Sequence, residues 1–270
     1  MHRSSTGRSG RFVTLTALLA GLALVVTACG GGRSDNGGGG GGSKGPIDTT
    51  NCATNPAKAT ISGDTITLGT SIPQSGIYSP FKEILAGSQA YISYLNNDLG
   101  GVTIAGKQYK VNLVAKDDAY EAAKTVANVQ SLLDQNVFGL FNVVGTKNNL
   151  AIRDTVNEAC VPNLLAATGS PAWGNHKYPW LLGTFLVPYP DEMKALVGYL
   201  NDNQPDATIA VLRANDDFGA AYSETLTSLV KGTKLKVVKV AQYDPETPDT
   251  KSQITTLAAT KADVLVLGAT

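Results

Sequence analysis

Residues 137–144 read VFGLFNVV, and GTKNN follows at once at residues 145–149. An almost unbroken apolar run of eight residues, bounded by turn formers, is typical of a strand buried on both faces of a parallel sheet. The spacing of Leu150, Ile152 and Val156 then predicts a helix over residues 148–158. The stretch therefore indicates an α/β fold.

A second strand is expected over residues 163–167, and it too ends in small residues, Thr168, Gly169 and Ser170. The carboxyl ends of neighbouring parallel strands meet at one edge of a sheet, which is where open α/β sheets bind ligands. We therefore expect Thr146 to lie near Thr168 at a binding edge. That these are ordinary turn residues is an equally valid interpretation for each one alone.

The same alternation of strand and helix patterns extends in both directions along the chain. Strands are expected over residues 65–69, 109–115, 180–186, 208–212, 234–242 and 264–267, with helices over residues 81–97, 119–135, 191–203, 220–230 and 252–260. Regular β-α alternation predicts parallel sheets joined by right-handed crossovers. The run VPYP at residues 187–190 interrupts it, so we expect two Rossmann-like lobes, 61–187 and 188–270. A second lobe of three strands would be incomplete, which indicates a truncated sequence.

The first 60 residues have a different character. Three arginines precede an apolar core at residues 13–26, which is too short for a comfortable membrane span. It ends in VTAC at residues 26–29, a pattern that resembles a bacterial lipobox, cleaved before Cys29 and acylated on that cysteine; an uncleaved membrane anchor is the alternative. We expect a signal peptide over residues 1–28 and, because residues 30–43 are mostly glycine, a flexible tether over residues 29–60.

Charge and cysteine content exclude several classes of function. Without the leader arginines, 19 of the 22 basic residues face 22 acidic ones, a net charge of −3 that offers no footprint for nucleic acid. In an exported chain Cys52 and Cys160 could form a disulfide, although two unpaired thiols are the alternative. The only histidines are His2 and His176, so we expect no metal site.

Six short motifs, taken together, resemble one protein family. They are PQSG at residues 73–76, GG at 100–101, the acidic pair at 117–118, GT at 145–146, ATGS at 167–170 and DDFG at 216–219. Each is loose, but their order and spacing over residues 61–270 resemble the substrate-binding lipoproteins of branched-chain amino acid type ABC transporters. The resemblance implies the type I periplasmic-binding fold, in which two lobes close over a ligand by hinge motion.

The resemblance also implies a set of ligand contacts. They are Ser75, Gly76, Thr146, Thr168, Gly169 and Ser170 in the first lobe, and Asp217 and Phe218 in the second. Hydroxyl groups and backbone N–H groups at helix starts suit a carboxylate, and an aromatic ring from the facing lobe would cover the apolar part of a ligand. The carboxylate that holds the ligand ammonium group in amino-acid binders of this family would lie after Thr270.

Four further residues are candidates with a competing interpretation. Lys147 departs from the family pattern and would accept an additional anionic group on the ligand, or it is a solvated helix start. Asp118 would polarise a ligand amine, or it caps the next helix. Trp173 would stack on ligand at the rim, or it packs on its own lobe; Tyr243 is a candidate for reaching the cleft.

Motifs for catalysis are missing. No GxGxxG and no GxSxG elbow follows an expected strand, and no Walker GxxxxGK[ST] occurs, so we expect no enzyme and no cofactor. We expect an extracytoplasmic protein, held on the cell membrane by lipid on Cys29, that passes a small solute to an ABC permease. The alternative is a lipoprotein that uses the same cleft to report its ligand to a membrane signalling partner.

Overall fold

The computed structural model describes Cys52 and residues 61–183 and 186–270. Our predictions for the signal peptide, Cys29 and most of the tether lie outside the described residues. In the part that is described, no helix is both long enough and apolar enough to cross a membrane. Residues 42–270 form one unit by their internal contacts, and this unit contains two separate sheets.

The first sheet has six strands in the order β3-β4-β2-β5-β6, with β1 paired to β2. The strands are β1 (Ile61–Ser62), β2 (Thr65–Ile72), β3 (Val102–Ile104), β4 (Lys107–Asp117), β5 (Gly139–Phe141) and β6 (Asn163–Leu164). Strand β2 pairs in parallel with both β4 and β5, and β5 pairs in parallel with β6. The predicted parallel sheet is thus confirmed, whereas the antiparallel additions β1 and β3 were not predicted.

Helices cover both faces of this sheet. Helices α2 (Ala122–Asp134) and α3 (Thr146–Ala159) bury Leu132 and Ile152 against Leu140 of β5. On the other side, α1 (Lys82–Asn97) contributes Leu85 to a cluster with Ile72 at the end of β2. Burying such side chains removes apolar surface from water, at roughly 25 cal/mol per Å². The apolar run at residues 137–144 therefore lies in the middle of the first core.

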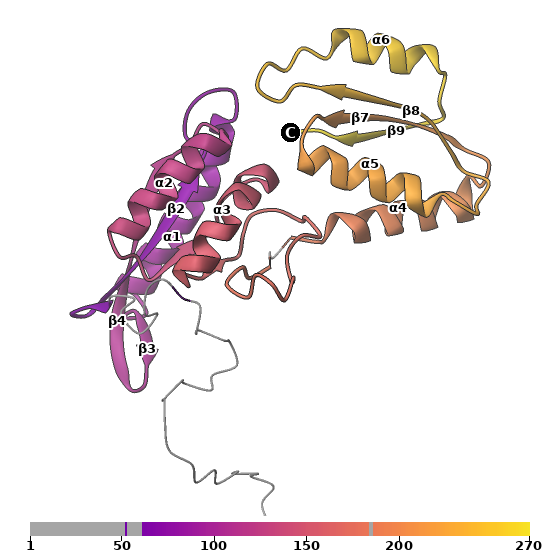
Figure 1. Ribbon diagram of the computed structural model, residues 1–270. Helices are drawn as coiled ribbons and strands as arrows, with labels where there is room; N and C mark the ends of the chain where they lie inside the picture. The colour runs from indigo at the N-terminus through magenta and orange to yellow at the C-terminus, as the bar shows by residue number, and fades with distance from the viewer. Residues whose placement is uncertain (1–51, 53–60, 184–185) are drawn as a thin grey trace, which may run out of the picture. The chain divides into compact units, whose positions relative to one another are not determined.

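The second sheet is smaller and wholly parallel, with the order β8-β7-β9. Its elements are α4 (Tyr189–Asn203), β7 (Thr208–Ala214), α5 (Asp217–Leu229), β8 (Lys236–Tyr243), α6 (Lys251–Ala259) and β9 (Val264–Gly268). Figure 1 shows α6 on one face of the sheet and α4 and α5 on the other. Leu257 accordingly packs on Leu212, while Leu226 packs on Val211 of the same strand.

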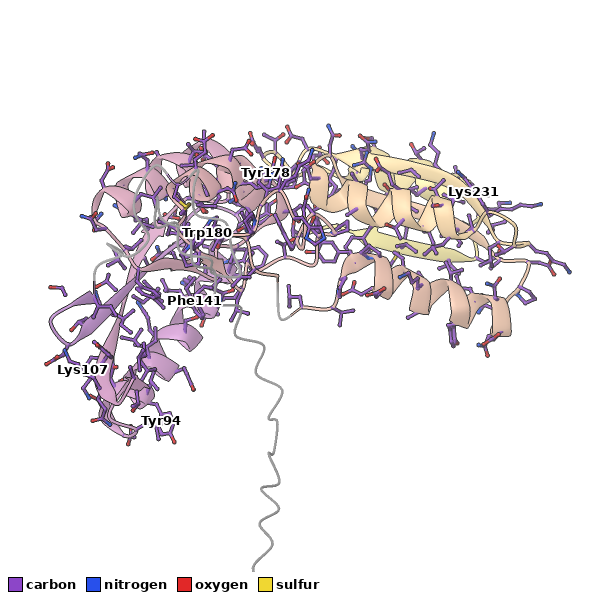
Figure 2. The ribbon with its side chains drawn as sticks, turned by 60° about the horizontal axis from the view of Figure 1, so that its bottom comes forward. Tyr94, Lys107, Phe141, Tyr178, Trp180 and Lys231 are labelled. Carbon is purple, nitrogen blue, oxygen red and sulfur yellow. A yellow bond between two sulfur atoms is a disulfide. The ribbon has the colours of Figure 1, made fainter. Side chains whose placement is uncertain are left out.

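The predicted strands at the centre of the first sheet were too long. Strand β5 stops after three residues because Asn142 takes a left-handed φ of 56°, and β6 stops because Leu165 has φ 53°. Pairing returns only as one bridge between Val144 and Ala167. The strand predicted over residues 180–186 is also wrong for the part described: the segment that carries Tyr178 and Trp180 (Figure 2) pairs with the sheet only through Leu181.

The loop predicted at residues 215–219 was wrong as well, because α5 begins at Asp217. Asp216 is the N-cap of this helix, and its Oδ1 accepts a hydrogen bond from the Gly219 N–H at 2.9 Å. A carboxylate at this position satisfies a backbone donor that the first turn leaves free. Asp217 and Phe218 therefore occupy the first helical turn instead of a loop.

A disulfide joins Cys52 to Cys160, with the Cα atoms 5.3 Å apart. Cys160 is buried and is the C-cap of α3 in a left-handed conformation. The bond ties the chain before the first sheet to the carboxyl end of the helix whose amino end carries Thr146.

Candidate functional site

A hollow of about 420 Å³ lies between elements of the two sheets. It is lined by Phe81, Ile84, Tyr120, Val144, Gly145, Thr146, Ala167, Leu186, Tyr189, Phe218 and Thr270. Val144, Gly145 and Ala167 lie at the carboxyl edge of the first sheet, and Phe218 lies in the first turn of α5. The volume suits a small organic molecule, and most of the lining is apolar.

The two threonines predicted at the sheet edge lie together. Their Oγ1 atoms are 2.6 Å apart, and both side chains are almost fully buried. Thr146 lines the hollow as the first residue of α3, where backbone N–H groups and the helix dipole favour an anion. Thr168 lies behind it and is not part of the lining.

Gly145 allows an aromatic ring to approach the turn before α3. Its φ is 101°, and a Cβ atom there would lie 2.7 Å from Cε2 of Tyr120. Tyr120 itself is buried, and this burial raises the pKa of its hydroxyl above the ordinary value of 10.0. The glycine of the GT motif is therefore required for the packing of a ring that lines the hollow.

Two aromatic clusters border the hollow, and sequence reasoning missed most of both. Tyr120 contacts Tyr78, with ring centroids 4.5 Å apart, and Phe81, with centroids 6.1 Å apart. On the second side, the rings of Phe218 and Tyr189 pack in a T-shaped arrangement with their centroids 5.2 Å apart. The sequence offered one signal, since these aromatic residues follow strand ends or a proline. This signal is weak, because apolar residues at such positions usually belong to the core.

Gly169 and Ser170 shape the turn after β6 but do not line the hollow. The Gly169 carbonyl accepts a hydrogen bond from the Tyr189 N–H at 2.8 Å, and a Cβ on Gly169 would lie 2.6 Å from the Tyr189 ring. The hydroxyl of Ser170 accepts a bond from the Ala172 N–H at 3.2 Å. These contacts fix the approach of Tyr189.

Three further predicted contacts do not line the hollow, as is also true of Thr168, Gly169 and Ser170. Ser75, Gly76 and Asp217 are solvent-exposed, and none belongs to its lining. Phe81, which follows this loop in the chain, lines the hollow instead. The turn sequence PQSG identified the correct loop region but not the residues that face the hollow.

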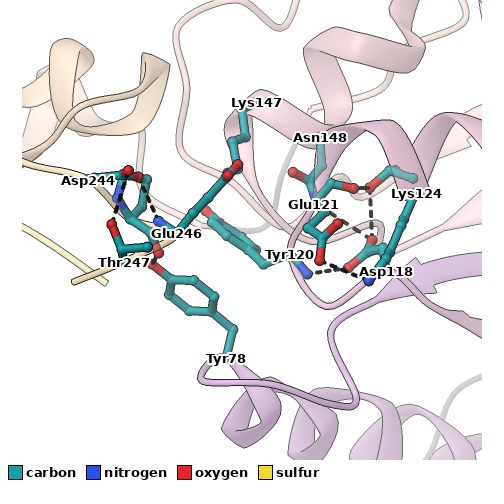
Figure 3. Close-up of polar contacts among 12 residues, drawn as sticks. Tyr78, Asp118, Tyr120, Glu121, Lys124, Lys147, Asn148, Asp244, Glu246 and Thr247 are labelled. Carbon is teal, nitrogen blue, oxygen red and sulfur yellow. Dashed lines mark hydrogen bonds and ion pairs between the residues drawn. The ribbon is translucent and has the colours of Figure 1, made fainter.

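Asp118 is fully buried in a network of hydrogen bonds (Figure 3). Its carboxylate accepts bonds from the Ser71 hydroxyl at 2.7 Å, the Tyr120 N–H at 2.9 Å and the Thr125 hydroxyl at 3.0 Å. Burial raises the pKa of Asp118 above 3.8, and these bonds oppose that effect. The carboxylate thus holds the turn before α2 and positions Tyr120.

The other three candidates differ in their surroundings. The Lys147 side chain is only 14% exposed, so it is not a solvated helix start; it forms an ion pair with Glu246 at 3.4 Å. Trp173 packs against the first core, so the structure places it on its own side. The Tyr243 hydroxyl bonds the backbone of Thr270, which lines the hollow, but Tyr243 does not line it itself.

Parallel sheets whose carboxyl ends border one apolar hollow define an α/β ligand-binding protein. The family described as "Periplasmic binding protein" matches residues 65–270. The chain therefore belongs to the periplasmic binding protein family, whose members are extracytoplasmic solute-binding proteins with the type I fold. A comparison with curated protein sequences found no match.

Solved structures show the same fold. A substrate-binding periplasmic protein from Ralstonia solanacearum is 28% identical with a TM-score of 0.67, over 76% of this chain and 57% of that one. A fatty acid ABC transporter substrate-binding protein from Thermomonospora curvata is 22% identical (TM-score 0.67; 77% and 52% covered). A branched-chain amino acid ABC transporter protein from Thermus thermophilus with bound valine is 18% identical (TM-score 0.65; 76% and 52% covered). The chain thus spans little more than half the length of these proteins.

Proposed function

We propose that this chain belongs to the solute-binding component of an ABC importer, which captures a small solute and delivers it to a permease. The observation that carries the proposal is that Thr146, at the carboxyl edge of the first sheet, and Phe218, from the second, line one hollow of about 420 Å³. Hydroxyl and N–H donors on one side and an aromatic ring on the other suit a molecule with a polar end and an apolar body.

In this proposal the two lobes, residues 61–187 and 188–270, close over the solute by a hinge motion. Thr146 and the N–H groups at the start of α3 hold the polar end, and Phe218 with Tyr189 covers the body. Thr168 supports Thr146, and Ser170 supports the turn behind it, through the hydrogen bonds described above. The solute is an amino acid, an amide or a small carboxylate.

The proposed location is the outer face of the cell membrane. The arginine-rich leader and the VTAC sequence at residues 26–29 support cleavage and lipidation at Cys29. More than one acyl chain on one cysteine gives stable membrane binding, and the glycine-rich tether would let the lobes reach a permease. We propose binding without turnover, because the described residues that line the hollow supply no nucleophile paired with a base.

The test is a thermal-shift screen of the mature full-length protein against amino acids, amides and small carboxylates. A solute that binds only the folded state raises the melting temperature. The best hit is then titrated into wild type, Phe218→Ala and, as an aromatic control on the exposed surface of α1, Tyr94→Ala. We expect Phe218→Ala to weaken binding by about tenfold or more and Tyr94→Ala to leave it unchanged. Equal affinity of Phe218→Ala and wild type would remove this hollow from the proposal.

A further inference from the structure

Among the described residues, no charged side chain lines the hollow. Besides the start of α3 at Thr146, charged groups just behind these lining residues can therefore influence which sign of charge the hollow prefers. Lys147 is directly next to Thr146 in the sequence and contacts a lining ring, because its Nζ lies 5.2 Å from the centroid of Tyr120. A cation over an aromatic face is attracted by the electrons of the ring, so this contact helps to hold the ammonium group at the wall.

Lys147 is mostly buried, and a buried ammonium group needs a counterion. Its partner is Glu246 in the loop after β8, with Nζ 3.4 Å from Oε1. The Glu246 side chain is 66% exposed, whereas that of Lys147 is 14% exposed. The pair is therefore unequal, with a cation fixed at the wall and a carboxylate that can move into solvent.

Asp244 orders the loop that carries this carboxylate. Its side chain accepts bonds from the Glu246 N–H at 2.9 Å and from the Thr247 hydroxyl at 3.1 Å. Figure 3 shows Lys147 and Glu246 pointing toward each other beside Tyr120. The loop thus presents Glu246 to the lysine, and the carboxylate is already neutralised when a solute arrives.

We infer that Lys147 sets the charge specificity of the hollow, favouring solutes with a carboxylate and no ammonium group. The lysine is paired with the carboxylate that could otherwise bind a solute ammonium group, and its own charge repels that ammonium group from the apolar hollow. A solute carboxylate is instead attracted by the Lys147 ammonium group. The exposed Glu246 side chain can turn outward into solvent, so that it does not repel this carboxylate. This inference rests on the proposed function, since it names the class of solute for the same hollow.

The experiment uses matched probes that share one apolar body: octanoate, octanamide and 2-aminooctanoate. Each is titrated by calorimetry into the mature full-length protein. We expect wild type to bind octanoate about tenfold or more tighter than 2-aminooctanoate, because placing two like charges next to each other is unfavourable by several kcal/mol. Octanamide, which carries no charge, should fall between the two.

Variants then assign this preference to the lysine. Lys147→Gln should reduce the octanoate to 2-aminooctanoate affinity ratio by about tenfold, whereas Lys147→Arg, which keeps the charge, should preserve it. Glu246→Gln removes the counterion and should raise the ratio. Lys194→Gln is the control, because Lys194 forms an exposed ion pair with Asp191 at 2.7 Å on α4.

Each outcome supports or overturns the inference. A purely structural ion pair would change the affinity for all three probes alike in Lys147→Gln, and an unchanged ratio would overturn the assignment. Wild type that prefers 2-aminooctanoate, or binds none of the probes, would overturn it as well. If the thermal-shift screen still finds another solute, the proposed function stands while this solute class fails. If that screen finds nothing, the proposed function fails too.

Discussion

The hydroxyl of Tyr78 donates a hydrogen bond of 2.6 Å to the carbonyl oxygen of Pro245, 167 residues further along the chain. Tyr78 precedes α1 beside the first sheet, and Pro245 follows β8 of the second. The neighbouring Glu246 meets Lys147 of α3, so two contacts join the same loop to the first sheet's elements (Figure 3). This loop is therefore a point at which the two halves of the proposed binding site are joined.

Removing that hydroxyl should destabilise the protein. We expect Tyr78→Phe to lower the free energy of unfolding by about 1–2 kcal/mol, since the Pro245 carbonyl loses its partner in a buried position. Urea unfolding followed by fluorescence measures the change. Tyr91→Phe, on the exposed face of α1, is the control and should stay within about 0.5 kcal/mol of wild type. Equal stabilities of the two variants would contradict the role given to this bond.

Gly145→Ala should be more harmful than an alanine at another glycine with positive φ. The backbone strain alone costs roughly 1–3 kcal/mol, because φ 101° with ψ 140° is a conformation that glycine alone adopts readily. At Gly145 the new methyl group also meets the Tyr120 ring, which adds roughly 1–3 kcal/mol. Gly174→Ala is the matched control, because Gly174 has φ 86° and a Cβ atom added there would meet no described atom within 4 Å. A difference near zero between the two free energies of unfolding would show that the ring moves aside without cost.

Asp118 should make stability depend on pH. Burial raises its pKa above 3.8, so the folded state keeps the proton to a higher pH than the unfolded chain does. The stability contribution is then fully present below the unfolded pKa and is lost as pH rises through the folded pKa. We therefore expect wild type to lose stability relative to Asp118→Asn as pH rises from about 4.

Unfolding free energies of both proteins, measured at half-unit intervals from about pH 4 to about pH 7, give this difference directly. Asp118→Asn is expected to be less stable overall, because an amide cannot accept every bond that the carboxylate accepts. Only the change with pH of the stability difference between wild type and Asp118→Asn tests the pKa of Asp118. A difference that is constant over the range would mean that Asp118 titrates at its ordinary value.

The disulfide should be a large stabilising element. It links residues 108 positions apart, and closing a loop of that size in the unfolded chain is worth about 4–5 kcal/mol. We expect the double variant Cys52→Ser/Cys160→Ser to lose much of this, seen as a lower midpoint in urea. Dithiothreitol should destabilise wild type similarly and leave the variant unaffected; sensitivity of the variant to dithiothreitol would assign the effect elsewhere.

The order of strands and helices could be predicted because strands buried on both faces leave continuous apolar runs. Residues 137–144 showed this pattern, and helix α3 follows within two residues of its expected start. The ends of strands could not be predicted in the same way. Asn142 and Leu165 adopt positive φ inside apolar runs, and the pattern of apolar residues does not reveal such local backbone changes.

The candidate site was accessible to sequence reasoning only in part. Thr146 was predicted from its place after a strand and Phe218 from the family resemblance alone, and both line the hollow. The start of α5 at Asp217 was missed although Asp216 is a typical N-cap residue. Tyr120 and Tyr189 were missed because an aromatic residue beside a strand end has the same sequence pattern whether it lines a cavity or fills a core.

We expect a solute to bind in the hollow between Thr146 and Phe218. A crystal structure of the mature full-length protein, grown with the best solute from the thermal-shift screen, tests it most directly. We predict electron density for that solute in the hollow, with its polar end at the Thr146 hydroxyl and its apolar body against the Phe218 ring. Density for the solute at any other place, with this hollow filled by side chains, would contradict the account.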